Sequence, residues 1–351
     1  MTNEKSTFFF IFLSYLTSTG CIDPVKFDKD QYQSKIVIDG SISNAPGPYQ
    51  VFVYGSKPFT EDGETELISL SKISIIDENG NLSNLREIST GRYETDSSAI
   101  RGEIGKSYFL KIKTADGREY QSKPERISPP VPIDTYNVTY STVVTNPKPF
   151  KLSILTKDPI EKGNYYKWKW THYDTTTACK TVVKATFGAR LNIINPCCEK
   201  CWRFDPCNSC LFIASDALIN GKNITTEVGD IPYEEPRKPY FMVLEQYSIS
   251  KEHYEFWKIA QTQINNSGGI FDNSPAQVQG NIYNPNDSTD SALGYFSASG
   301  VNQKSVFFIR DRIEYPKRLS SGIVTSTQIL NKCLPCGEAL RTTRQPVGWK
   351  E

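Results

Sequence analysis

The sequence predicts a mainly β protein, in which an N-terminal immunoglobulin-like or transthyretin-like sandwich precedes a second β-rich domain with one amphipathic helix packed on it. Short runs such as Tyr49–Tyr54 and Ser107–Lys113 alternate apolar and polar residues and are rich in β-branched and aromatic types, which is typical of half-buried strands. Turn residues such as Asp116-Gly117 separate the runs and favour hairpins. A segment at about 250–266 has instead the composition of a helix.

Length and composition exclude several classes of protein. The chain has 351 residues, of which 38% are hydrophobic and 23% charged, with a formal net charge of +1. This balance excludes a disordered, collagen-like or polytopic membrane protein, and it gives no bulk charge for binding nucleic acid. Because single cores stop growing at about 250–300 residues, a chain of this length favours two domains.

Residues 1–20 have the features of a secretory signal peptide. A charged start is followed by an apolar run of about nine residues, from Phe8 to Leu16, and by small residues before Cys21. A bilayer-spanning helix needs about 20 apolar residues. Gly20-Cys21 resembles a bacterial lipobox, although Ser18 stands where most lipoboxes have Leu. We therefore expect cleavage before Cys21 and acylation of its thiol, for example with palmitate, with residues 21–34 as a tether. An ordinary secreted protein is the alternative.

The remaining cysteines favour disulfides, because an even number of cysteines in an exported chain is typical of a disulfide framework. Their spacing also contains Cys-x2-Cys pairs, so a structural zinc site and redox chemistry are the alternatives. Export to an oxidising compartment favours disulfides over both, and we expect no metal. Sequence alone does not give the pairing. The eight candidates are Cys179, Cys197, Cys198, Cys201, Cys207, Cys210, Cys333 and Cys336.

The domains follow from composition along the chain. Residues 35–127 contain strand runs and turn residues at the spacing of a sandwich. Residues 128–132, Ser-Pro-Pro-Val-Pro, form a stiff linker, since each proline fixes φ and removes a donor. Residues 133–351 are again mostly strand and include a cysteine-rich insert at 197–210. In the helical segment, Ser250 is a suitable N-cap. We expect the aromatic side of this helix to pack on a sheet.

The search for catalytic residues finds no nucleophile elbow, phosphate-binding loop or zinc-protease motif. The two histidines, His172 and His253, have no orienting partner that the sequence indicates, so we expect no enzyme and no cofactor. The run 165–170 offers aromatic rings that could stack on a sugar or a partner protein, and burial between sheet and helix is the alternative. The candidate contact residues are Tyr165, Tyr166, Trp168 and Trp170.

Several segments, among them Asp39–Tyr49, Gln246–Trp257 and Leu293–Phe296, together resemble the DUF4249 family, a group of uncharacterised lipoproteins of Bacteroidetes-type bacteria. The similarity extends over nearly all of the chain after Cys21, but many members lack the cysteine-rich insert. The segments that carry the resemblance are Asp39–Tyr49, Gly163–Trp168, Gln246–Trp257, Gly280–Ile282, Leu293–Phe296, Cys333-x2-Cys336 and Gly348-Trp349.

The resemblance implies an exported lipoprotein whose gene often lies beside that of a TonB-dependent outer-membrane receptor. We therefore expect a non-catalytic accessory that binds or docks on such a transporter, held at the outer membrane by its lipid, on the periplasmic or the cell-surface face. The family supplies no active-site residue and no small-molecule ligand. A surface hydrolase or metal-dependent enzyme using His172 or His253 is one alternative, and an adhesin or structural surface protein is the other.

Overall fold

A computed structural model describes residues 34–57, 65–140, 150–186, 190–207, 210–231, 239–265 and 278–309, together with a few positions between 336 and 349. It is mainly β with one helix, α2 (Lys251–Asn265), as the sequence predicts. The predicted signal peptide 1–20, Cys21, nearly all of the tether 21–34 and Cys333 lie outside the described residues. No helix in the described ranges is both long and apolar enough to cross a membrane.

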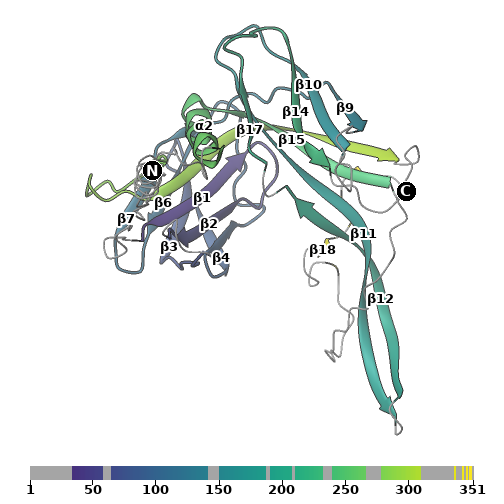
Figure 1. The fold of residues 1–351 in the computed structure, drawn as a ribbon. Coiled ribbons are helices and arrows are strands. Elements are labelled where there is room, and N and C mark those ends of the chain that lie inside the picture. Colours follow the sequence, from purple (N-terminus) through teal and green to yellow (C-terminus); the bar gives the residue numbers. More distant parts are fainter. Residues whose placement is uncertain are drawn as a thin grey trace, which may run out of the picture.

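The first sandwich has two facing layers (Figure 1). One layer contains β5, β2 and β1, and the other contains β4, β3, β6 and β7, with β4 paired to strands of both. The bounds are β1 Ile36–Ser43, β2 Gln50–Gly55, β3 Lys72–Asp77, β4 Leu82–Ser89, β5 Arg92–Thr95, β6 Ser107–Lys113, β7 Glu119–Ser122 and β8 Glu125–Arg126, which pairs with β6.

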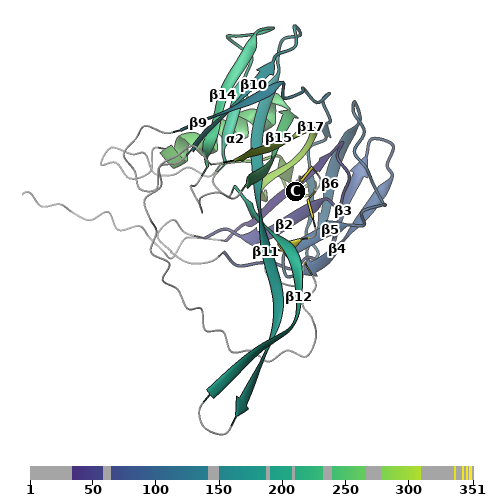
Figure 2. The ribbon, with the colours of Figure 1, turned by 90° about the vertical axis from the view of Figure 1, so that its right-hand side faces the viewer.

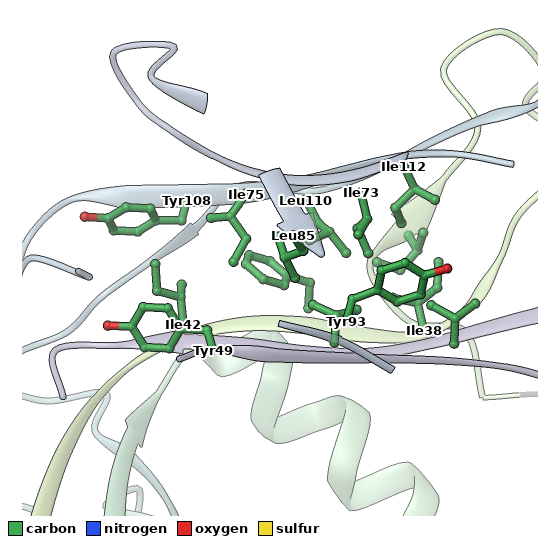
Figure 3. Packing of buried hydrophobic residues seen from close by; sticks show 14 of the residues in the cluster. Ile38, Ile42, Tyr49, Ile73, Ile75, Leu85, Tyr93, Tyr108, Leu110 and Ile112 are labelled. Carbon is green, nitrogen blue, oxygen red and sulfur yellow. The ribbon is translucent and has the colours of Figure 1, made fainter. Parts of the chain in front are cut away.

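The core of this sandwich confirms the alternating pattern. In β6, Tyr108, Leu110 and Ile112 point inward and are buried, while the residues between them are more exposed. Figure 3 shows them facing side chains of the other layer, among them Ile38 and Ile42. Asp116-Gly117 forms the predicted turn between β6 and β7, and Gly117 takes a φ of 89° that a side chain would oppose.

The second half of the chain forms another pair of sheets. A three-stranded sheet of β9 (Thr135–Tyr140), β10 (Phe150–Lys157) and β14 (Asn223–Ile231) packs on a larger sheet, and side chains of both bury one another. The larger sheet contains β11 Tyr165–Thr186, β12 Arg190–Pro206, β13 Phe212–Ser215, β15 Pro239–Ile249, β17 Leu293–Ile309 and β18 Thr342–Thr343.

One strand belongs to both sandwiches. The first part of β17 pairs in parallel with β1, from Leu293 opposite Val37 to Ser299 opposite Ser43, and its second part pairs antiparallel with β15. β16 (Ile282–Tyr283) pairs with β7, and Phe296 and Ile282 are buried in the first core. The predicted range 35–127 is therefore too short for this sandwich, because residues from beyond the linker complete it.

The proline-rich segment 128–132 is fixed against two strands, β15 and the shared strand β17. Val131 N donates to Ser248 Oγ at 3.2 Å, and Val131 O accepts from Gln246 Nε2 at 2.9 Å. At Gly300, in the middle of β17, a Cβ atom would lie 2.1 Å from the carbonyl oxygen of Ser128. Since real Cβ contacts are never this short, the crossing of segment and strand requires glycine at position 300.

Gly300→Ala should therefore destabilise the protein by about 2 kcal/mol or more, because the clash is with backbone that cannot move aside cheaply. Gly55→Ala is the matched control: it is also a strand glycine, but its added Cβ would meet the side-chain oxygen of Ser34 at 3.0 Å. Urea unfolding of both variants measures the difference. Equal losses would show that the crossing at Gly300 tolerates a side chain.

Candidate functional site

Two strands project from the body as a long ribbon (Figures 1 and 2). β11 pairs with β15 only as far as Tyr173, opposite Phe241. Beyond that point it pairs with β12 alone, up to Thr186 opposite Arg190. β12 has one further partner among the described residues, the short strand β18 at Trp202 and Arg203. We call residues 174–186 and 190–201 the arm.

The arm changes the interpretation of the predicted cysteine-rich insert 197–210. Residues 197–206 are not a separate knuckle but the second half of β12, in register with β11. Cys198 lies opposite Cys179 in this ladder. Only Cys207 and Cys210 lie in the loop that follows. Alternation did not reveal this strand, because Pro196 and the clustered cysteines interrupt the apolar pattern that marks most strands.

Among the cysteines whose side chains the structure describes, disulfides join four of the eight candidates, which confirms the disulfide interpretation for these four. Cys201 is bonded to Cys336, with 5.5 Å between their Cα atoms, and Cys207 is bonded to Cys210. The Glu199 carboxylate lies within 4.8 Å of both sulfurs of the first bond, and Glu199 Oε2 accepts a hydrogen bond from Cys336 N at 3.3 Å. The side chains of Cys179, Cys197 and Cys198 lie outside the described residues, as does Cys333.

The C-terminal segment contacts the base of the arm through Cys336, the strand β18 and the pair Gly348-Trp349. We call these residues together the clasp. The Trp349 ring lies 5.9 Å from that of Trp202 and 5.4 Å from that of Phe241, both in edge-on geometry. Edge-on contacts between aromatic rings stabilise a structure beyond what burial of the rings contributes. The clasp therefore fixes the point where the arm leaves the sheet.

Three of the four candidate aromatic contact residues are core residues. Tyr166, Trp168 and Trp170 are only 0%, 1% and 8% exposed, since even positions of β11 face the three-stranded sheet. Their polar atoms are satisfied internally, as where Trp168 Nε1 donates to Gln246 Oε1 at 2.7 Å. The prediction that they contact a ligand is therefore wrong. Tyr165 points the other way and packs on Tyr254 of α2, with ring centroids 5.1 Å apart.

A buried lysine lies on the helix side of the same strand. Lys167 is 6% exposed, and its Nζ lies 3.6 Å from the centre of the Trp257 ring. Burial, and then the charge of Lys169, hold the pKa of Lys167 well below its ordinary value. The cation–π contact with Trp257 compensates only part of the cost of burying an ammonium group.

Both histidines are buried against aromatic rings. His253 stacks on Tyr295 at 4.6 Å and accepts a hydrogen bond from Trp257 Nε1 at 2.7 Å. Burial, and then Lys167, lower the pKa of His253 well below its ordinary value, so its ring is neutral at pH 7. His172 stacks on Tyr240 at 3.8 Å. Their surroundings are those of core residues.

A groove of about 670 Å³ lies between α2, β8 and β17. Glu125 of β8 lines it and is only 5% exposed. The hydroxyl of Tyr295 donates to Glu125 Oε1 at 2.5 Å, whereas Glu125 Oε2 has no hydrogen-bond partner among the described residues. Burial, and to a smaller extent the charge of Glu252, raise the pKa of Glu125.

Sequence analysis did not find this groove, because no motif links its residues. Glu125 lies 170 positions from Tyr295, and α2 separates them along the chain. The one part of the groove that the sequence indicated is the start of the helix, through the predicted N-cap Ser250. Ser250 Oγ accepts a hydrogen bond from His253 N at 3.1 Å, which confirms where the helix begins. That cap positions Glu252 and Glu255 at the groove.

Replacing Lys167 by Met should stabilise the protein at neutral pH, because a pKa lowered by one unit costs the charged folded state about 1.4 kcal/mol. The unfolded state takes up a proton below about pH 10.4, while the folded state resists it. The gain should therefore be largest at pH 7 and vanish above pH 11. Lys113→Met, at an exposed position of β6 in the other sandwich, is the control, and chemical unfolding at both pH values is the measurement. A loss of stability at pH 7 would show that the contact with Trp257 outweighs desolvation.

Removing the Cys201–Cys336 disulfide should cost more stability than removing Cys207–Cys210. The sequence separations are 135 and 3, which correspond to roughly 5 and 2 kcal/mol of loop entropy. Double alanine variants, compared by urea unfolding under non-reducing conditions, measure the two losses. Equal losses would contradict the importance of the clasp.

The family comparison agrees with the resemblance seen in the sequence. The family model described as "Domain of unknown function (DUF4249)" matches residues 22–305, which is most of the chain. The match includes the first sandwich, the arm and nearly all of the second sandwich, and it ends within β17, before the clasp. None of the curated proteins matches the chain. The chain belongs to the DUF4249 family.

Proposed function

We propose that the protein is a non-catalytic, lipid-anchored component of the cell envelope that docks on a TonB-dependent outer-membrane transporter. The observation that carries this proposal is the arm. Two-stranded ribbons are marginally stable in water on their own, and here β11 and β12 continue for more than ten residues beyond the last pairing with β15. An extension of this kind is explained if a partner covers it.

The chemistry of the arm suits a protein partner. Among the described residues, neither edge of the ribbon has another strand beside it from Ala178 to Thr186 on β11 or from Arg190 to Glu199 on β12. Unpaired backbone donors and acceptors are a template for an added strand. The clasp fixes the orientation of the arm at its base. Binding of a partner therefore costs less conformational entropy. We assign the partner to the transporter because the family likeness suggests that association.

The anchor supports the same proposal. The family match begins at residue 22, directly after the cysteine predicted to carry the lipid. A tether of residues 21–34 spans at most about 50 Å when fully extended. Several acyl chains on Cys21 would therefore keep the sandwiches within that distance of the membrane, where a transporter surface is at high effective concentration.

Deleting residues 178–199 tests the docking function of the arm. Thr177 lies opposite Lys200 in the ladder, so an Asn-Gly turn between them would close a short hairpin and keep Cys201. Cys333→Ser is added because the deletion removes three cysteines. In mild detergent, the intact protein should co-purify with the transporter, and the deletion variant should lose at least about 90% of it.

Two controls make this experiment decisive. The deletion variant retains Cys21 and should stay in the membrane fraction, whereas Cys21→Ser should be released from it. An unchanged melting temperature of the body shows that the sandwiches still fold. Equal recovery of transporter with and without the arm, or no transporter with the intact protein, would overturn the proposal.

A further inference from the structure

The groove beside α2 presents a carboxyl group whose burial the fold itself does not explain. Glu125 is 5% exposed, the Tyr295 hydroxyl donates to its Oε1, and its Oε2 has no hydrogen-bond partner among the described residues. The side chains of Ser250 and Asn281 also interact with this carboxyl group and partly oppose the rise in its pKa, but neither donates a hydrogen bond to Oε2. Leaving a buried carboxylate oxygen without a donor is costly, and such groups usually mark a site that a ligand completes.

The groove gathers further acidic and apolar groups around Glu125. Glu252 and Glu255 of α2 line it, and neither has an ion-pair partner among the described residues. The α2 macrodipole stabilises carboxylates in the first turn of the helix, but it does not account for Glu125, which lies on another element. Phe256 and Ile259 supply the apolar wall, and Ile259 is 50% exposed.

We propose that this groove binds an organic cation, the ammonium or guanidinium end of an aliphatic chain. The cation would donate to the unpartnered Oε2 of Glu125, with Glu252 and Glu255 beside it. The aliphatic stem would lie against Phe256 and Ile259. Charge-assisted hydrogen bonds of this kind are the strong ones, and a short stem on an apolar wall adds burial.

The charged groups around Glu125 set the proton balance of binding. Glu252 faces it from α2, and Lys123 and Arg126 line the groove from either side of Glu125. The Tyr295 hydroxyl faces it from β17, with His253 stacked behind the ring. Burial and Glu252 raise the pKa of Glu125, and a bound cation opposes both. Binding near pH 5 should therefore release protons.

Calorimetric titration with N-acetyl-lysine methylamide and with 1,5-diaminopentane tests this site in the intact protein. N-acetyl-norleucine methylamide is the neutral isostere. At least one cationic probe should bind at least about tenfold more tightly than the isostere. Measurement in two buffers of different ionisation enthalpy should show proton release. Tighter binding of the peptide probe assigns the cation to a protein side chain, and tighter binding of the diamine assigns it to a free polyamine.

Glu125→Gln should weaken binding of the cation at least about tenfold and reduce the proton release. Glu252→Gln changes an exposed position and should weaken binding about twofold to fivefold, which keeps the test valid if Glu125→Gln does not fold. The control is Glu227→Gln, whose carboxylate pairs with Lys151 on another sheet. Equal binding of cation and isostere, or cation binding that neither Glu125→Gln nor Glu252→Gln reduces, overturns the proposal.

Discussion

The pairing of β17 with both β1 and β15 is the constraint on which the rest of the structure depends. Its first half completes the core of the first sandwich, and its second half lies in the larger sheet of the second. Because one continuous strand contributes to both cores, the two halves of the chain cannot move as independent bodies without breaking backbone hydrogen bonds. Gly300 lies where the halves meet, under the proline-rich segment.

Buried polar groups strengthen the same junction. The side chain of Gln246 accepts from Trp168 Nε1 and from Thr156 Oγ1, both at 2.7 Å, and donates to the carbonyl of Val131. One amide thus connects both sheets of the second sandwich to the segment that leads out of the first. A buried amide whose oxygen and nitrogen both form hydrogen bonds favours one arrangement over its alternatives. It also explains why the aromatic residues of β11 belong to the core.

Local structure could be predicted from the sequence because it depends on near neighbours. The alternation in Ser107–Lys113, the Asp116-Gly117 turn and the Ser250 cap each act over a few residues, and all three are present. Strand partners depend on distant residues. Periodicity does not indicate that Val37 pairs with Leu293. The predicted range of the first domain, 35–127, is therefore too short. The groove could not be predicted for the same reason, since its residues come together only when that pairing forms.

The alternation along β17 ties the groove to the core. Phe296 and Ala298 point into the first sandwich, while Tyr295 lies on the other face of β17 and contacts Glu125 and His253. A shift of one residue in the pairing with β1 would place Tyr295 in the core and Phe296 in the groove. Gly294 prevents such a shift, because a Cβ atom there would lie 2.0 Å from the carbonyl oxygen of Ile38, and no neighbouring residue could take its place. The register that builds the hydrophobic core therefore also places the hydroxyl of Tyr295 on the buried carboxyl group.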